Sequence, residues 1–121
     1  MIGYVTLGTN DLARGAAFYD ALLAEMGAKR GWQTDRYIAW NFSNGSMLCI
    51  ITPYDQQPAT VGNGMMVSLA AGSKAEVDAV YARAMALGAK DEGAAGPRGD
   101  SFYAGYFRDL DGNKLAVYHA G

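Results

Sequence analysis

The fold of this chain is decided by residues 106–115, which read Tyr-Phe-Arg-Asp-Leu-Asp-Gly-Asn-Lys-Leu. Asp111-Gly112 separates two apolar runs, at about residues 102–108 and 114–118. An Asp-Gly or Asn-Gly pair between such runs predicts a β-hairpin, because both residue types tolerate the left-handed backbone of a tight turn. The arrangement also occurs earlier, where Asn44-Gly45 separates residues 37–42 from 47–51. Each half of the chain therefore ends in a predicted hairpin.

Upstream of these hairpins, the chain repeats itself. Tyr4-Val5-Thr6-Leu7 aligns with Met66-Val67-Ser68-Leu69 at a shift of 62 positions, and the same shift aligns Tyr19 with Tyr81. After a one-residue slip, the segment 27–29 (Gly-Ala-Lys) matches the identical segment 88–90. Internal repeats determine architecture, so we expect two copies of one structural unit.

Each repeat begins with an alternating strand followed by an amphipathic helix. The first helix is predicted to be capped by Asn10 or Asp11 and to end at Gly27, and the second begins at the capping box 73–76 and ends at Gly88. Weaker strand signals occur near residues 31–33 and 92–96. The order is that of two tandem βαβββ modules, at about 1–54 and 64–121, joined by a polar linker within one domain. The predicted class is α+β, with helices packed on one face of curved antiparallel sheet.

The overall composition excludes several classes of partner. The 121 residues are 50% hydrophobic with a net charge of −2, and no cluster of Lys or Arg occurs, so no nucleic-acid partner is expected. No apolar run approaches the length of a membrane span, so no membrane partner is expected either. The single cysteine, Cys49, fits a reducing compartment, and we expect a cytoplasmic protein.

Two segments resemble one known family. Residues 4–12 followed by Ala17-Phe18-Tyr19 resemble the opening strand and helix of the vicinal-oxygen-chelate superfamily, which includes glyoxalases, bleomycin-resistance proteins and extradiol dioxygenases. Residues 106–115 resemble its closing hairpin, and the resemblance covers nearly the whole chain. It implies two modules side by side, forming an open cup of curved mixed or antiparallel sheet with the helices outside. It also implies a homodimer.

In enzymes of that superfamily, a divalent metal in the cup is bound by His, Gln and Glu side chains. The resemblance places these ligand positions at Tyr4, Cys49, Met66 and Ala116. Alanine has no donor atom, a thioether is a soft ligand, and Tyr4 would have to lose a proton whose reference pKa is about 10. We therefore expect a member without a metal or other cofactor.

Strand alternation predicts which side chains line the cup. Successive residues of a strand point to opposite faces, so every second residue faces the helices and the residues between them face the cup. The candidate ligand-binding residues are Tyr4, Thr6, Met47, Cys49, Met66, Ser68 and Tyr118, with Trp40 and Tyr103 on strands of uncertain register and Arg98 on a loop. Lys114 has the same parity, at the rim. Such a set is mainly apolar and aromatic, as small-molecule sites generally are.

Several candidates have a second interpretation. Trp40 is more consistent with a core position than with a ligand contact, and Tyr4 and Tyr118 are as consistent with solvated sheet aromatics as with binding residues. Arg98 and Arg36 could hold an anionic substrate group or could be solvated loop residues. Cys49 is more consistent with a structural thiol than with a nucleophile, because the lone histidine, His119, has the wrong parity to activate it.

Two functions have specific support in the sequence, and a structural or partner-binding module is a third possibility that has none. The first is a metal-independent small-molecule-binding protein of the glyoxalase/bleomycin-resistance type that holds an apolar or aromatic ligand. The alternative is a lyase or isomerase similar to lactoylglutathione lyase, acting on a small carbonyl or thiol adduct. No catalytic residue is identifiable from the sequence.

Overall fold

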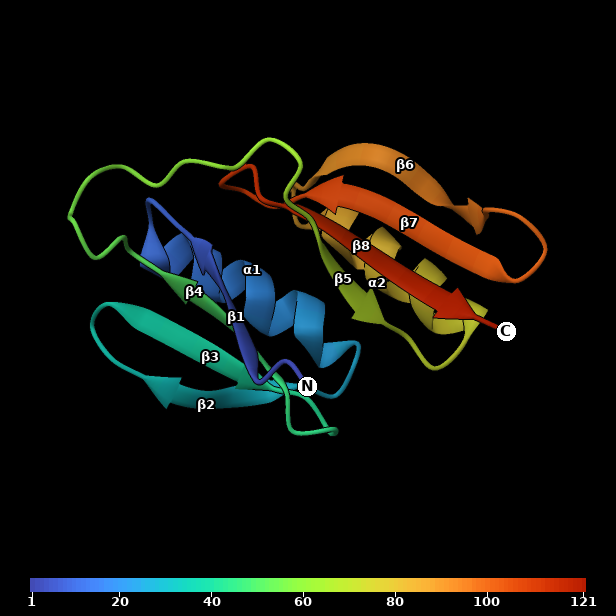
Figure 1. The fold of residues 1–121 in the computed structure, drawn as a ribbon, viewed down its shortest axis with the longest axis horizontal. Helices are drawn as coiled ribbons and strands as arrows, with labels where there is room; N and C mark the ends of the chain where they lie inside the picture. The colour runs from blue at the N-terminus through green and yellow to red at the C-terminus, as the bar shows by residue number, and fades with distance from the viewer. The chain divides into compact units, whose positions relative to one another are not determined.

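The computed structural model describes residues 1–121 and divides into two compact units, Met1–Val61 and Gly62–Gly121 (Figure 1). The boundary between the units lies within the polar segment 53–64 that the sequence marks as a linker. Each unit contains one helix and four strands in the order βαβββ, which confirms the predicted α+β class and the internal repeat.

The first unit consists of β1 (Tyr4–Gly8), α1 (Leu12–Ala24), β2 (Lys29–Gln33), β3 (Tyr37–Asn41) and β4 (Met47–Ile51). Its strands form a curved sheet in the order β1-β4-β3-β2 (Figure 1). β1 runs parallel to β4, while the β4–β3 and β3–β2 pairs are antiparallel. The sheet is therefore mixed, and α1 covers one of its two faces.

The helix α1 begins and ends where local chemistry requires. Asp11 is the N-cap, and its carboxylate accepts a hydrogen bond from the backbone nitrogen of Arg14 at 3.0 Å. Gly27 follows the helix with a φ of 72°, a left-handed conformation that glycine adopts without steric cost. Phe18, Leu22 and Leu23 are buried on the helix face toward the sheet. This packing buries one face of the sheet and leaves the other open.

The second unit repeats this design with β5 (Val67–Ala70), α2 (Lys74–Ala86), β6 (Lys90–Pro97), β7 (Phe102–Arg108) and β8 (Lys114–Ala120). The sheet order is β5-β8-β7-β6, with β5 parallel to β8 and the other pairs antiparallel. Ser73 caps α2 by accepting from the backbone nitrogen of Glu76 at 3.1 Å, as the capping box predicts. Gly88 ends the turn after α2 with a φ of 94°.

Both closing hairpins turn on a glycine with positive φ. Gly45 has a φ of 91° and Gly112 a φ of 90°. In the second hairpin, the buried Asp109 carboxylate accepts hydrogen bonds from the backbone nitrogens of Asp111 and Asn113, both at 2.9 Å. The turn residues thus satisfy backbone donors that the hairpin would otherwise leave unpaired.

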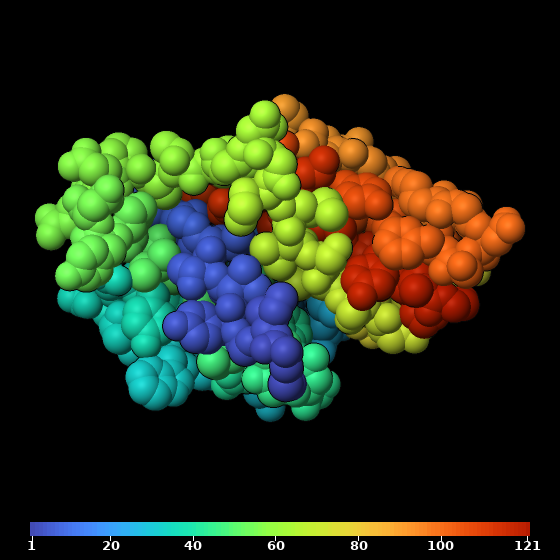
Figure 2. Space-filling model, in the orientation of Figure 1, coloured from blue at the N-terminus to red at the C-terminus, as the bar shows by residue number.

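The segment that follows β4 runs over the surface, where Figure 2 shows it in green. Within this segment, Ala59 is hydrogen-bonded to Asn10. Its backbone nitrogen donates to Asn10 Oδ1 at 2.7 Å, and its carbonyl accepts from Asn10 Nδ2 at 3.2 Å. Neither helix of the molecule is long and apolar enough to cross a membrane.

Candidate functional site

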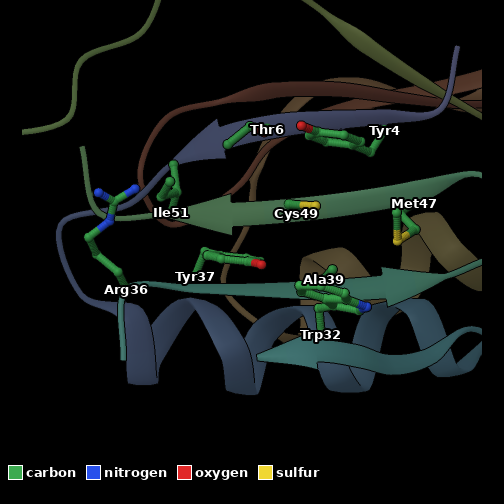
Figure 3. A pocket seen from close by; sticks show the side chains of 9 residues that line it. All are labelled: Tyr4, Thr6, Trp32, Arg36, Tyr37, Ala39, Met47, Cys49 and Ile51. Atoms are coloured by element: carbon green, nitrogen blue, oxygen red, sulfur yellow. The ribbon is translucent and has the colours of Figure 1, made fainter. Parts of the chain in front are cut away.

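The open face of the first sheet contains a pocket of about 430 Å³ (Figure 3). Nine residues line it: Tyr4, Thr6, Trp32, Arg36, Tyr37, Ala39, Met47, Cys49 and Ile51. All nine belong to the first unit, and they come from all four of its strands and from the loop before β3. The volume lies within the range of roughly 300–1,000 Å³ that is usual for small-molecule sites.

Strand alternation determines which side chains reach the pocket. On β4, Met47, Cys49 and Ile51 line the pocket, while Leu48 and Ile50 are buried on the opposite face, toward α1. Ile50 lies so close to α1 that a Cβ added at Gly15 would come within 2.9 Å of its Cδ1. The odd-numbered residues of β4 therefore face the pocket and the even-numbered residues face α1, as the strand alternation in the sequence predicts.

The floor of the pocket is small and apolar. Ala39 of β3 and Cys49 of β4 are paired in the ladder, and their side chains are only 1% and 5% exposed. Burial raises the pKa of the Cys49 thiol, which disfavours the thiolate that a nucleophile requires. No hydrogen bond connects this thiol to His119, which instead contacts the carbonyl of Ala71 through Nδ1 at 3.0 Å. This arrangement favours the structural interpretation of the cysteine.

The walls of the pocket carry aromatic rings and hydroxyl groups. Tyr4 and Thr6 project from β1, Tyr37 from β3, and Trp32 from β2 (Figure 3). The Tyr4 and Trp32 side chains are largely exposed, at 63% and 71%. Exposed aromatic rings around a buried apolar floor are suited to stacking on a flat apolar molecule.

Arg36 closes one end of the pocket beside Ile51, as Figure 3 shows. Its backbone carbonyl accepts a hydrogen bond from the Thr52 nitrogen at 3.0 Å, which extends the β3–β4 ladder by one pair. Its guanidinium carbon lies 5.2 Å from the centre of the Tyr54 ring. Arg36 is the only charged residue among the nine that line the pocket.

Two predicted candidates lie on the helix side of their sheets. Trp40 is 1% exposed, packs 5.7 Å from the Tyr19 ring, and donates from Nε1 to Asp20 of α1. Tyr103 of β7 donates from its hydroxyl to Asp78 of α2 at 2.7 Å. Neither residue lines the pocket. The core interpretation of Trp40, which the sequence left open, is the one that matches its position.

The remaining candidates lie in the second unit. Ser68 of β5 and Tyr118 of β8 lie on the sheet face away from α2, opposite the buried Leu69 and Val117. The Tyr118 ring stacks on Phe102 with centroids 5.3 Å apart. Met66 precedes β5 and is 46% exposed.

Arg98 is occupied by local contacts. It donates to the Ala94 and Pro97 carbonyls at 2.7 and 3.3 Å, and its guanidinium carbon lies 5.5 Å from the Tyr106 ring centre. Lys114 approaches the same ring at 5.9 Å. Arg98 thus satisfies several of its donors within its own unit.

Comparison with known proteins identifies the family. The family model described as the Glyoxalase/Bleomycin resistance protein/Dioxygenase superfamily matches residues 1–117. The chain belongs to this superfamily. The family resemblance expected from residues 4–19 and 106–115 is therefore confirmed. None of the proteins with a curated function matches the sequence.

Solved structures of the superfamily share this fold. A glyoxalase/bleomycin resistance protein from Albidiferax ferrireducens T118 is 37% identical, with a TM-score of 0.93 over 100% of this chain and 99% of that one. A lactoylglutathione lyase from Agrobacterium tumefaciens is 24% identical, with a TM-score of 0.75 over 98% of this chain and 92% of that one. At 24% identity, the likeness to the lactoylglutathione lyase shows only that the fold is shared.

The residues at the positions where the resemblance places the metal ligands do not have the donor chemistry of a divalent-cation site. Ala116 is 2% exposed and has no donor atom, and Met66 offers only a thioether. Cys49 lies on an apolar floor that favours the neutral thiol. No group of three or more His, Cys, Asp or Glu side chains in the structure could hold a metal ion.

Sequence reasoning missed part of the pocket. Trp32, Ala39 and Tyr37 were not among the expected lining residues, and Arg36 had two interpretations. The signal on β3 is the alternation of the large apolar residues Ile38 and Trp40 with Tyr37 and Ala39, and the structure places the second pair in the pocket. Trp32 could not be found this way, because the β2–β3 register shifts between Arg30 and Gln33 and breaks the alternation.

Proposed function

We propose that this chain is a metal-independent small-molecule-binding protein of the glyoxalase/bleomycin-resistance type, and that it holds an apolar or aromatic ligand in the pocket of its first unit. The pocket itself carries the proposal. It combines a volume of about 430 Å³ with a buried apolar floor and exposed aromatic walls. A few hydroxyl groups, on Tyr4, Thr6 and Tyr37, supply the polar contacts that orient a ligand in such sites.

The proposal assigns binding to the four predicted residues that line this pocket, Tyr4, Thr6, Met47 and Cys49, and adds Trp32 and Tyr37. Met66, Ser68, Tyr118 and Arg98 do not line it. Met47 suits this role because its unbranched thioether adapts to ligands of different shape. The donor sets at Tyr4, Cys49, Met66 and Ala116 support independence from metal, for the chemical reasons given above.

A homodimer in the cytoplasm completes the proposal. The homodimer follows from the family resemblance, and the unpaired thiol of Cys49 is consistent with a reducing compartment. Light scattering coupled to gel filtration measures the oligomeric state directly. A single species with the mass of one chain would remove this part of the proposal and leave the binding function intact.

The alternative function is a glyoxalase-like lyase or isomerase acting on a small carbonyl or thiol adduct. Its support is the fold shared with the lactoylglutathione lyase from Agrobacterium tumefaciens. Such an enzyme would need Tyr4, Tyr118 or Lys114 as its acid or base. Turnover of a hemithioacetal that survives in a Tyr4→Phe/Tyr118→Phe double variant would remove both tyrosines from this assignment and leave Lys114 alone.

Native mass spectrometry of untagged protein, purified without chelator, tests the proposal first. We expect a mass that protein alone accounts for, or protein with an organic adduct, for the dimer as for the single chain. A stoichiometric divalent metal that survives desalting would contradict metal independence.

A matched pair of variants tests the place of binding. Thr6 and Ser68 occupy the same position in the two repeats, and both are exposed on an edge strand. Thr6→Phe places a ring at the pocket wall, whereas Ser68→Phe places the same ring outside the pocket. In a thermal-shift screen of aromatic compounds, we expect Thr6→Phe to lose the stabilisation by ligand and Ser68→Phe to keep it. Equal responses of the two variants would place binding elsewhere.

A further inference from the structure

The charge of the pocket is unbalanced. Arg36 contributes a permanent positive charge, and no carboxylate is among the other eight lining residues. Arg30 and Arg108, by contrast, form ion pairs with Asp20 and Glu92, and both pairs lie outside the pocket. The pocket therefore offers a ligand one uncompensated cation.

The Arg36 side chain is positioned rather than loose. Its backbone nitrogen donates to Thr34 Oγ1 at 3.1 Å, and its carbonyl accepts from the Thr52 nitrogen at 3.0 Å. The guanidinium then lies over the Tyr54 ring at 5.2 Å, within cation–π range. Two backbone bonds and one ring thus hold the charge at the same end of the pocket as Ile51 (Figure 3).

The guanidinium also keeps its hydrogen-bonding capacity. Arg30 and Arg108 use their side-chain nitrogens on carboxylates, and Arg98 uses them on backbone carbonyls. No hydrogen bond or ion pair engages the side chain of Arg36, and a cation–π contact with a ring uses none of the guanidinium N–H donors in a hydrogen bond to an oxygen. Such a planar fork binds a carboxylate or a similar oxyanion with two parallel bonds.

The opposite end of the pocket is apolar. In Figure 3, Trp32, Met47 and the Tyr4 ring lie at the end away from Arg36, with Ala39 beside Trp32. Cys49 lies between Met47 and the Tyr37 side chain. A ligand that fits both ends has an apolar body and a charge at one end only.

We infer that the pocket selects monoanionic aromatic or apolar ligands, with the anionic group held by Arg36 and the apolar body against Trp32 and Met47. This inference rests on the proposed function, because it names the class of ligand for the same pocket. Arg36 is then the residue that decides specificity, while Tyr54 positions it from outside the pocket.

Two probes of one shape test the charge requirement. Naphthalene-2-carboxylate and naphthalene-2-carboxamide differ in charge but hardly in size. Their affinities are measured by calorimetry or NMR titration in a buffer free of phosphate and carboxylates. We expect the carboxylate to bind about tenfold more tightly, because a hydrogen bond to a charged acceptor is stronger than one to a neutral amide. Raised ionic strength should narrow the difference.

Variants of Arg36 and Arg98 identify which guanidinium binds the carboxylate. Arg36→Gln should remove the preference for the carboxylate and leave binding of the carboxamide unchanged, and Arg36→Lys should restore part of the preference. Arg98→Gln, the same substitution outside the pocket, should leave both affinities unchanged. Tyr54→Leu should weaken binding of the carboxylate less than Arg36→Gln does, because it frees the guanidinium without removing it.

The outcomes separate this inference from the proposed function. Equal affinities for the two probes, lost together in Thr6→Phe, would overturn the charge requirement while supporting the pocket. A preference that survives in Arg36→Gln, or that depends on Arg98, would overturn the assignment to Arg36. Failure of both probes to bind at millimolar concentration would count against the inference and the proposed pocket alike.

Discussion

Trp40 donates a hydrogen bond from its indole nitrogen to Asp20 Oδ1 at 3.0 Å, on the face of the first sheet that packs against α1. The same carboxylate accepts two bonds from Arg30, at 2.8 and 2.7 Å. One aspartate on the helix therefore connects β3, through Trp40, with β2, through Arg30. This contact explains why a large aromatic residue near the pocket belongs to the core.

The first prediction concerns the acid stability of this contact. The hydrogen bonds from Arg30, and after them the bond from Trp40, hold the pKa of Asp20 below its ordinary value of 3.8. Since the unfolded chain then binds the proton more readily, the carboxylate stabilises the fold above about pH 4. That contribution is lost as the pH falls through the lower folded-state pKa.

Urea unfolding between pH 2.5 and 7 checks this expectation. Asp20→Asn should be less stable than the wild type at pH 7, and the difference should shrink at the acid end. Asp100→Asn removes an exposed carboxylate in the loop before β7 and should show no such trend. A difference for Asp20→Asn that stays constant with pH would contradict the prediction.

The two tryptophans should report on different parts of the first unit. Trp32 lies at the pocket wall and is 71% exposed, whereas Trp40 is 1% exposed. We expect a bound ligand to change the emission of Trp32 and leave that of Trp40 unaltered. Single-tryptophan variants, Trp32→Phe and Trp40→Phe, separate the two signals in a fluorescence titration.

The same two variants should differ in stability. Trp32→Phe should change the free energy of unfolding by less than about 0.5 kcal/mol, as exposed substitutions generally do. Trp40→Phe should cost about 1–3 kcal/mol, because it leaves space in a buried site and removes the bond to Asp20. Chemical denaturation measures both values, and equal losses would contradict the assigned positions.

Cys49 should react slowly in the folded protein. Its side chain is 5% exposed, and burial raises the pKa of the thiol, so both access and thiolate fraction are reduced. We expect a thiol reagent at pH 8 to label it far more slowly in the native state than in urea. A bound pocket ligand should slow labelling further, since Cys49 lies on the pocket floor. Native labelling as fast as in urea would count against this placement.

The first hairpin should depend on the backbone freedom of Gly45. Its φ of 91° disfavours any residue with a Cβ, although a Cβ there would meet no atom within 4 Å. Gly45→Ala should therefore destabilise the protein by about 1–2 kcal/mol through backbone strain alone. Gly3→Ala is the matched control, because Gly3 has equally open surroundings and no positive φ. Thermal unfolding of the two variants measures the difference, and equal melting temperatures would contradict the strain argument.

Much of the pocket could be predicted from strand parity. Tyr4, Thr6, Met47 and Cys49 were expected on the open face because they alternate with Val5, Leu7, Leu48 and Ile50, and the structure places them there. The prediction weakened on β3, where the uncertain register left open whether Trp40 faces the pocket or the core. It failed on β2, because a register shift removes the period of two on which parity depends.

The sequence by itself determined the family, the two βαβββ repeats, the helix caps and the tight turns of this protein. These features arise from contacts between residues a few positions apart, such as Asp11 with Arg14 and Ser73 with Glu76, or from the backbone freedom of a single glycine. Only the tertiary structure decided that Arg36, and not Arg98, lies in a pocket. The partners of Arg36 are Thr52 and Tyr54, more than a dozen residues further along the chain. A strand pattern specifies a face, but contacts between segments distant in the sequence place a side chain at one end of it.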